Sequence, residues 1–207
     1  MKRLLDLAVA SVALLLLSPL LVAVALVIMA SMGRPVLFRQ QRPGRNGRPF
    51  ELIKFRTMAP LKESGGAPER DHDRIPRVGR FLRATSIDEL PELWNVLRGD
   101  MSLVGPRPLL MRYLGRYTPE QARRHEVRPG LTGWAQVSGR NALTWEEKFA
   151  LDIWYVDNRS FWLDLRILLL TMRSILRKDG INVGEEETMP EFLGSYSITS
   201  AGAPDRD

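Results

Sequence analysis

Two neighbouring carboxylates, Asp88 and Glu89, are the residues of this 207-residue chain whose chemistry is easiest to name. Paired acidic side chains can supply a nucleophile, a proton acceptor or ligands for a hard cation. Apolar residues at helical spacing predict a helix over positions 87–97, with Ser86 and Glu89 in a capping-box pattern and Pro91 delaying the regular helix slightly. A first helical turn favours ionised carboxylates and anionic ligands, although acidic residues that only offset the helix dipole give the same pattern.

A single arginine, Arg107, stands between Pro106 and Pro108. The two prolines restrict the backbone on either side, so the guanidinium has little freedom. Arginine binds phosphate through two parallel hydrogen bonds, a role that benefits from a fixed position. Further along, three glycines that permit close backbone approach precede two polar side chains: Gly130, Gly133, Gly139, Arg140 and Asn141. By itself this second segment is also consistent with a purely structural loop.

The composition favours anionic partners and excludes several classes of enzyme. The chain has 30 Lys and Arg residues against 24 Asp and Glu, a formal net charge of +6, which suits phosphates, lipid head groups or nucleic acid. It contains no cysteine, which excludes disulfides, thiolate metal sites and thiol nucleophiles. Residues 59–73 are rich in proline, glycine and charge and predict a loop, in which His72 between two aspartates only weakly indicates a metal site.

An apolar segment at the N-terminus, residues 4–32, carries Asp6 as its only charge. As one straight helix it would reach about 43 Å, more than the ~30 Å hydrocarbon core of a bilayer. The segment is also longer than the apolar region of a cleaved signal peptide, so we expect it to remain attached. Basic residues at both ends give each the cytoplasmic signature of the positive-inside rule: Lys2 and Arg3 before it, and Arg34, Arg39, Arg42, Arg45 and Arg48 after it.

The pair Ser18-Pro19 lies in the middle of this segment and predicts a bend. Proline removes one backbone donor from a helix, and the serine hydroxyl can satisfy the carbonyl that is left free. One interpretation is a re-entrant hairpin with both ends in the cytoplasm. The other is a spanning helix with an ordinary proline kink, and the residues alone leave both open.

The remaining elements follow from local patterns. Two extended runs joined by turn residues predict a β-hairpin over positions 36–57. Apolar spacing predicts helices over 145–156 and 161–176, whose aromatic residues suit either a core or a bilayer interface. The polar tail is expected to be weakly ordered. The predicted fold is α+β and predominantly helical, with a membrane segment (1–33), a compact domain (34–183) and the tail (184–207).

Three motifs in a fixed order resemble those of the bacterial sugar transferases called monotopic phosphoglycosyl transferases. They are KFRTM at residues 54–58, TSIDELPELWNVLRGDMSLVGPRP at 85–108 and RPGLTGWAQVSGRN at 128–141. The resemblance covers roughly residues 1–181, and contiguous motifs in one order are far more specific than a short signature. It implies the minimal catalytic form of the family. One departure is Pro76, where the family pattern leads us to expect threonine.

The resemblance implies a reaction and a location. Members of this family transfer a phosphosugar from a nucleotide diphosphate sugar, usually a uridine one, to a polyprenyl phosphate and release the nucleotide monophosphate. This step starts the assembly of membrane-bound glycans. Because the lipid phosphate lies at the head-group boundary, the resemblance places the site on the cytoplasmic face of the bacterial inner membrane, in contact with its lipid. It also favours the re-entrant hairpin, with amphipathic interfacial helices around the catalytic domain.

The resemblance also assigns residues. Asp88 is expected to attack the sugar-bearing phosphorus and form a covalent intermediate, while Glu89 either supports a metal or accepts a proton. Mg²⁺ is the implied cofactor, with Asp88 and Glu89 as its ligands. Phosphate and substrate contacts are expected from six further side chains: Lys54, Arg83, Arg107, Gln136, Arg140 and Asn141.

Two other classes of function remain as alternatives. One is a membrane-tethered module that binds polyanions without catalysis, and the other is a catalytically silent scaffold for glycan assembly. Neither accounts for the acidic pair beside the rigid Pro-Arg-Pro, so we expect an enzyme with no nucleic-acid partner. Homo-oligomerisation, the identity of the sugar and the separate roles of Glu89 and the metal stay open.

Overall fold

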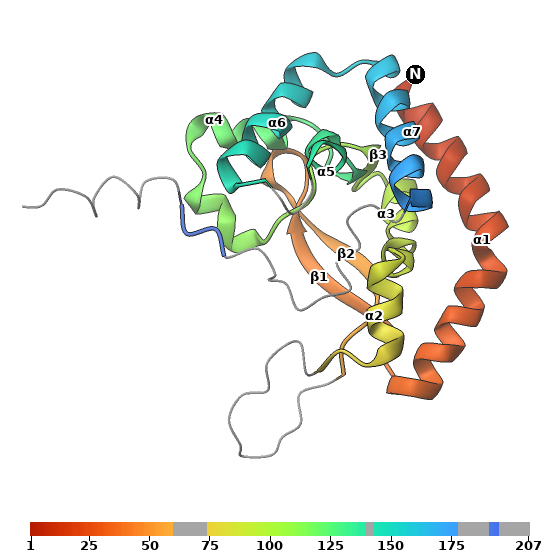
Figure 1. The fold of residues 1–207 in the computed structure, drawn as a ribbon. Coiled ribbons are helices and arrows are strands. Elements are labelled where there is room, and N and C mark those ends of the chain that lie inside the picture. The colour runs from red at the N-terminus through yellow and green to blue at the C-terminus, as the bar shows by residue number, and fades with distance from the viewer. Residues whose placement is uncertain (60–73, 140–142, 178–190, 195–207) are drawn as a thin grey trace, which may run out of the picture.

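The computed structural model describes residues 1–59, 74–139, 143–177 and 191–194, and most of them are helical (Figure 1). The helices are α1 (Lys2–Met32), α2 (Arg77–Ala84), α3 (Glu92–Arg98), α4 (Pro119–Ala122), α5 (Trp134–Ser138), α6 (Trp145–Asn158) and α7 (Phe161–Arg177). The strands β1 (Leu37–Pro43) and β2 (Pro49–Phe55) form one sheet, and β3 (Ser102–Val104) and β4 (Gly130–Thr132) form another. These elements confirm an α+β, predominantly helical fold.

The predicted β-hairpin is present. Strands β1 and β2 are antiparallel, with Leu37 opposite Phe55 and Pro43 opposite Pro49. Side chains of β2, including Phe50 and Leu52, are buried in the main core, into which α3 also packs. The hairpin therefore fixes Lys54, near the end of β2, relative to the start of α3.

The second sheet brings two distant segments together. Strand β3 runs parallel to β4, with Ser102 opposite Gly130. A Cβ atom on Gly130 would lie 2.1 Å from the nitrogen of Gly105, and one on Gly133 would lie 2.2 Å from the Gly105 oxygen. The predicted close approach is thus confirmed for both glycines, and it fixes the backbone immediately before Pro106.

The N-terminal segment is one continuous helix that curves along one side of the molecule (Figure 1). Pro19 lies within it, and the Ser18 hydroxyl donates a 2.8 Å hydrogen bond to the Leu15 carbonyl, the acceptor that Pro19 leaves without its usual donor. The helix as a whole is curved (Figure 1). The expected pair of hairpin helices is not found, because α1 continues through Pro19 as one helix and the Ser18 hydroxyl satisfies the freed carbonyl.

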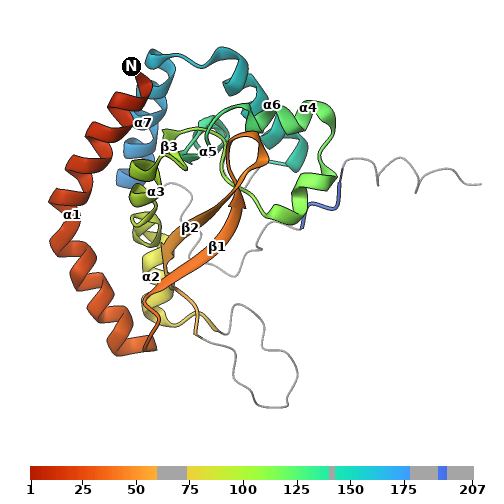
Figure 2. The same ribbon diagram turned by 180° about the vertical axis from the view of Figure 1, so that it is seen from behind.

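Both ends of α1 contact the same folded body (Figures 1 and 2). At the N-terminal end, the Lys2 ammonium lies 2.6 Å from Asp164 Oδ2 on α7, and Arg3 donates to the carbonyls of Val96 and Leu97 at the end of α3. At the other end, the Arg56 guanidinium donates to the carbonyls of Met32 and Gly33. The curvature of α1 therefore returns its two ends to one domain.

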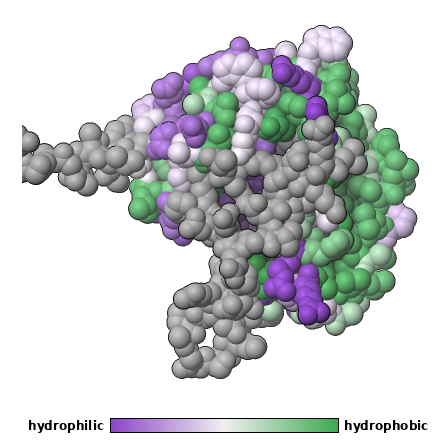
Figure 3. Space-filling view, in the orientation of Figure 1, coloured by the Kyte–Doolittle hydropathy of each residue, from purple (hydrophilic) through white to green (hydrophobic). Residues whose placement is uncertain are grey.

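Apolar surface gathers on the side of the molecule formed by α1 (Figure 3). Within the described residues, α1 is the helix long and apolar enough to cross a membrane. The predicted helices at 145–156 and 161–176 are confirmed as α6 and α7. Helix α6 buries much of its apolar face, whereas α7 leaves large apolar side chains in solvent: Phe161, Trp162, Leu169, Met172 and Ile175.

Candidate active site

The acidic pair lies in a short turn that precedes α3. Residues Ile87–Glu89 form a single 3₁₀ turn, and α3 begins only at Glu92, after Pro91. The predicted capping box is wrong: Ser86 has a left-handed backbone with φ of 55°, and its side chain makes no capping hydrogen bond. This backbone turns the chain between α2 and α3, so the two carboxylates lie outside the regular helix.

Asp88 is buried, with 9% of its surface exposed. No side chain in the described residues forms a hydrogen bond or ion pair with its carboxylate. Burial and the neighbouring charge of Glu89 raise the pKa of Asp88 to about 6, although the cations of Lys54, Arg83 and Arg107 oppose this shift. At neutral pH the group is a carboxylate that is ionised, weakly solvated and more basic than an ordinary aspartate.

Glu89 has different surroundings. Its Oε1 atom lies 2.8 Å from the Lys54 ammonium and 2.6 Å from Arg107 Nη2. Burial opposes ionisation, but these two cations overcome it and lower the pKa of Glu89 to about 2. Glu89 therefore holds two of the predicted phosphate-binding cations beside Asp88.

A third carboxyl group, Glu92, belongs to the same cluster and was not among the predicted site residues. Its side chain is 4% exposed, and its Oε1 atom lies 3.0 Å from the Lys54 ammonium without hydrogen-bond geometry. Burial and the charge of Glu89 raise the pKa of Glu92 to about 7, against the effect of Lys54. Its three-residue spacing from Glu89 was a usable signal, because positions three apart share one side of a helical turn.

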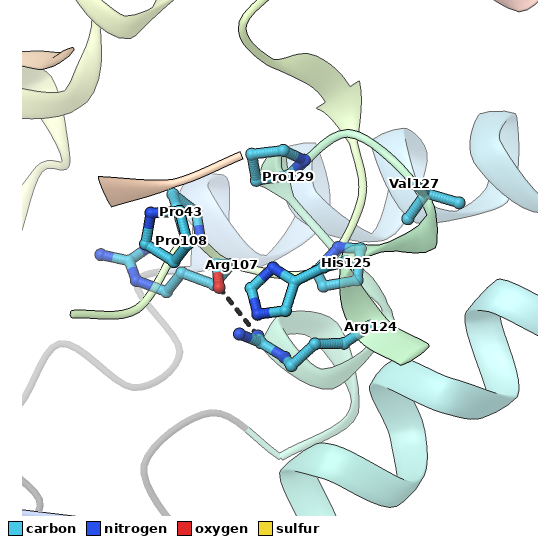
Figure 4. A pocket seen from close by; sticks show the side chains of 8 residues that line it. Pro43, Arg107, Pro108, Arg124, His125, Val127 and Pro129 are labelled. Carbon is cyan, nitrogen blue, oxygen red and sulfur yellow. Dashed lines mark hydrogen bonds between the residues drawn. The ribbon is translucent and has the colours of Figure 1, made fainter. Parts of the chain in front are cut away.

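A second arginine, Arg124, forms a hydrogen bond with the backbone of Arg107. The Arg124 guanidinium donates to the Arg107 carbonyl at 2.8 Å (Figure 4). It also pairs with the Asp152 carboxylate at 2.6 Å. Arg107 and Arg124 line a shallow hollow together with four prolines: Pro43, Pro106, Pro108 and Pro129. The predicted stiffness of the Pro-Arg-Pro segment therefore also depends on contacts with Arg124 and Asp152. The sequence patterns did not identify these two residues.

Arg83 completes the positive surroundings of Asp88. It lies in the last turn of α2, where its Nε donates to the Thr57 hydroxyl at 2.9 Å, and its charge acts to lower the pKa of Asp88. Gln136 instead donates to the Leu131 carbonyl, and no hydrogen bond or ion pair between described residues links it to the acidic cluster. The other predicted side chains, Arg140, Asn141 and His72, lie outside the described residues.

The donor set at the acidic pair suits magnesium. Among the residues that the structure describes, no group of three or more His, Asp or Glu side chains forms a metal cage. Mg²⁺ is commonly bound by one or two carboxylates together with substrate phosphates and water, which needs no such cage. Of the two carboxylates, Asp88 is the more available to a metal ion, because Glu89 Oε1 already contacts two cations.

The chain is similar to known proteins over most of its length. Residues 1–178 match the family described as bacterial sugar transferase. A Bacillus subtilis protein named uncharacterized sugar transferase EpsL is 53% identical over 200 residues, covering 97% of this chain and 99% of that protein. A Caulobacter vibrioides UDP-glucose:undecaprenyl-phosphate glucose-1-phosphate transferase is 47% identical over 189 residues, covering 86% of this chain and 70% of the relative.

A third relative is longer than this chain. It is the Escherichia coli UDP-glucose:undecaprenyl-phosphate glucose-1-phosphate transferase, 39% identical over 182 residues that cover 83% of this chain but 39% of the relative. A family match over residues 1–178 spans most of the chain and defines the class of protein. The chain belongs to the bacterial sugar transferase family, as the motifs predicted.

Proposed function

We propose that this enzyme transfers a phosphosugar from a uridine diphosphate sugar to a polyprenyl phosphate and releases uridine monophosphate. The names of the Caulobacter vibrioides and Escherichia coli relatives support this reaction class. The observation that carries it here is the buried carboxylate of Asp88, which no described side chain pairs with, beside three cationic side chains: Lys54, Arg83 and Arg107. This arrangement suits attack on a phosphorus atom whose oxygens need positive partners.

The proposed chemistry has two displacements at phosphorus. A carboxylate oxygen of Asp88 attacks the sugar-bearing phosphorus, forming an acyl phosphate bond, while the bridging oxygen leaves with its electron pair on uridine monophosphate. An oxygen of the polyprenyl phosphate then attacks the same phosphorus and displaces the Asp88 carboxylate. The products are a polyprenyl diphosphate sugar and the regenerated enzyme, and the anomeric bond is untouched.

The cations hold the diphosphate in this proposal. Lys54 and Arg107 are already oriented by Glu89, so phosphate oxygens can bind them at the cost of weakening those ion pairs. Arg83 approaches Asp88 from α2. Glu89 thus positions both cations, which is a further role beside metal support and proton acceptance. Gln136, Arg140 and Asn141 stay predictions as substrate contacts.

Mg²⁺ is proposed as the cofactor. Asp88 and Glu89 would hold it, and it would neutralise and orient the oxygens of the diphosphate. Asp88 is the stronger ligand candidate of the two because no described side chain occupies its carboxylate. Three cationic side chains around the pair would share the compensation of substrate charge.

The site is proposed to lie at the cytoplasmic face of the inner membrane, with α1 as a re-entrant helix. The contacts of Lys2 and Arg56 support this, since they attach opposite ends of α1 to one domain. A helix that crossed the bilayer completely would separate its ends by the ~30 Å apolar core. The exposed apolar side chains of α7 would lie in the same interface and bring the site to the depth of a lipid phosphate.

Release of uridine monophosphate from a panel of uridine diphosphate sugars, with one polyprenyl phosphate and Mg²⁺, tests this function. We expect one or a few sugars to support turnover. Asp88→Asn should abolish it, because an amide is a poor nucleophile, whereas Asp157→Asn in an exposed ion pair of α6 is the matched control. Salt-sensitive binding of polyanions without nucleotide release by any preparation would instead support the polyanion-binding module.

A further inference from the structure

A short C-terminal segment, residues 191–194, packs against the body although it lies beyond the family match, which ends at residue 178. Phe192 is 3% exposed. Its ring is surrounded by four aromatic rings with centroid distances between 5.0 and 5.8 Å: Tyr113, Tyr117, Trp145 and Phe149. Such distances are those of stabilising aromatic pairs. We call these four residues the aromatic pocket.

Polar contacts fix the direction in which the segment enters the aromatic pocket. Glu191 Oε1 lies 2.7 Å from Arg116 Nη1 and 3.2 Å from Arg112 Nε. Arg116 also donates to the Phe192 carbonyl, and the Phe192 amide donates to the Tyr113 hydroxyl at 3.3 Å. The next residue, Leu193, is 70% exposed. The pocket therefore contacts an acidic residue followed by an aromatic one, and we call Glu191 and Phe192 the C-terminal anchor.

The aromatic pocket is continuous with the support of Arg107. The Tyr117 ring stacks on Phe192 at an interplanar angle of 22°, and its hydroxyl lies 3.4 Å from Arg124 Nη1. Arg124 in turn donates to the Arg107 carbonyl and pairs with Asp152. Two side chains, Tyr117 and Arg124, thus connect the C-terminal anchor to the backbone of the phosphate-binding arginine.

We propose that the aromatic pocket is a binding site for an acidic-aromatic residue pair, occupied by this chain's own Glu191 and Phe192, and that its occupancy positions Arg107 through Tyr117 and Arg124. This inference rests on the proposed role of Arg107 at the diphosphate. Removal of the Phe192 ring leaves a void among four rings, and neighbouring side chains relax into such voids. Relaxation of Tyr117 would loosen Arg124 and with it the Arg107 backbone.

Phe192→Ala in the full chain tests the proposal, with Leu193→Ala as the matched control at the adjacent, exposed position. We expect kcat/KM for the nucleotide sugar to fall about tenfold in Phe192→Ala, since displacing a positioned group costs rate steeply, and to change by less than about twofold in Leu193→Ala. Glu191→Gln keeps the Phe192 ring but removes the charge that faces Arg112 and Arg116, and it should lower kcat/KM by an intermediate factor. This variant replaces Phe192→Ala as the test if Phe192→Ala does not fold.

A double-mutant cycle separates positioning from general stability. If Phe192 acts through Arg107, then Phe192→Ala should cost little further activity in an Arg107→Lys background. A peptide copying residues 188–197 should restore part of the activity of Phe192→Ala at a temperature where that variant is folded. The same peptide with alanine at position 192 should not.

Two results would overturn the proposal. One is unchanged kcat/KM in Phe192→Ala while Arg107→Lys is impaired. The other is a double variant whose fold-loss in kcat/KM equals the product of the fold-losses of Phe192→Ala and Arg107→Lys. Both differ from failure of the proposed function, in which the unmodified chain would release no uridine monophosphate from any uridine diphosphate sugar.

Discussion

Asp88, Glu89 and Glu92 carry the same functional group, yet their surroundings give them different protonation behaviour. Two cations at hydrogen-bond distance lower the pKa of Glu89 to about 2, whereas burial raises that of Asp88 to about 6 and that of Glu92 to about 7. Carboxylates whose pKa values are pushed apart in one site commonly divide its tasks. Here Glu89 is suited to hold cations, and Asp88 is suited to attack.

Arg107 should not be replaceable by lysine. Lysine keeps the charge but lacks the planar fork that binds two oxygens at once. We expect Arg107→Lys to lower kcat/KM for the nucleotide sugar at least about tenfold, the loss of about one bidentate, charge-assisted contact. Steady-state kinetics measure this, and Arg98→Lys is the control, because the Arg98 side chain is exposed and pairs with Asp100. Wild-type turnover and affinity in Arg107→Lys would contradict the bidentate role.

Glu92 should make stability depend on pH. Its pKa in the folded state, about 7, lies above the ordinary value of 4.5, so the fold favours the protonated form. The folded state therefore loses stability as pH rises from the ordinary pKa through about 7, and Asp88 contributes with the same sign at lower pH. In melting experiments with a chelator present, Glu92→Gln should reduce the loss of Tm between about pH 5 and pH 8. If the loss of Tm between these pH values were the same in Glu92→Gln, Glu92 would not be the group that causes the pH dependence.

The contacts of Asp6 explain why a charged residue lies in the apolar segment of α1. Its carboxylate is buried and accepts hydrogen bonds from the Ser102 hydroxyl at 3.0 and 3.1 Å and from the Leu103 amide at 3.1 Å. It is therefore a contact between α1 and β3, the strand that leads to the Pro-Arg-Pro segment. The sequence showed the charge, but its partners lie more than ninety positions away.

Asp6→Ala should destabilise the fold. It leaves the Ser102 hydroxyl and the Leu103 amide buried without an acceptor, which costs about 1–3 kcal/mol for each unsatisfied group. We expect a lower Tm in detergent, with Leu4→Ala at an exposed position of the same helix as the control. Equal melting of the two variants would mean that the contact between α1 and β3 adds no stability.

Topology can be measured directly because the chain has no cysteine. A cysteine added before Met1 and one at Arg39 should be labelled from the same side of oriented vesicles if α1 is re-entrant. Pro19→Ala restores a donor for the Leu15 carbonyl and should favour a straight helix, so the N-terminal cysteine should become accessible from the opposite side. Val12→Ala, at an exposed position of α1, is the control. If the two cysteines were labelled from opposite sides in the chain that keeps Pro19, the re-entrant proposal would be contradicted.

Much of the fold could be predicted because its elements follow from local patterns. The two extended runs joined by turn residues in β1 and β2 and the helical spacing in α6 and α7 are properties of short windows. The parallel pairing of β3 with β4, the Arg124–Asp152 pair and the burial of Glu92 depend on contacts between distant segments, and no local pattern reports them. The left-handed Ser86 shows the same limit, since its capping-box pattern was overridden by the turn between α2 and α3.

The whole molecule combines three features that the proposed reaction needs. Helices α1 and α7 present apolar side chains, and the apolar side formed by α1 is visible in Figure 3. The acidic cluster lies at the start of α3, and Arg124, which contacts Tyr117 of the aromatic pocket, donates to the Arg107 carbonyl. A reaction between a lipid-bound phosphate and a soluble nucleotide sugar needs such a combination of environments. The fold thus supplies depth, charge and rigidity from separate elements.

The proposed covalent attachment of the phosphosugar to Asp88 can be detected by mass spectrometry of the intact protein. The protein is mixed with Mg²⁺ and its nucleotide sugar, without polyprenyl phosphate, and quenched rapidly. We expect a mass increase equal to one sugar phosphate less one water, located by digestion on the peptide that contains Asp88, with up to one equivalent of nucleotide monophosphate released per site. The adduct should be absent in Asp88→Asn and present in Asp157→Asn. An active preparation that forms no adduct, and releases nucleotide only after polyprenyl phosphate is added, would contradict the proposed covalent attachment.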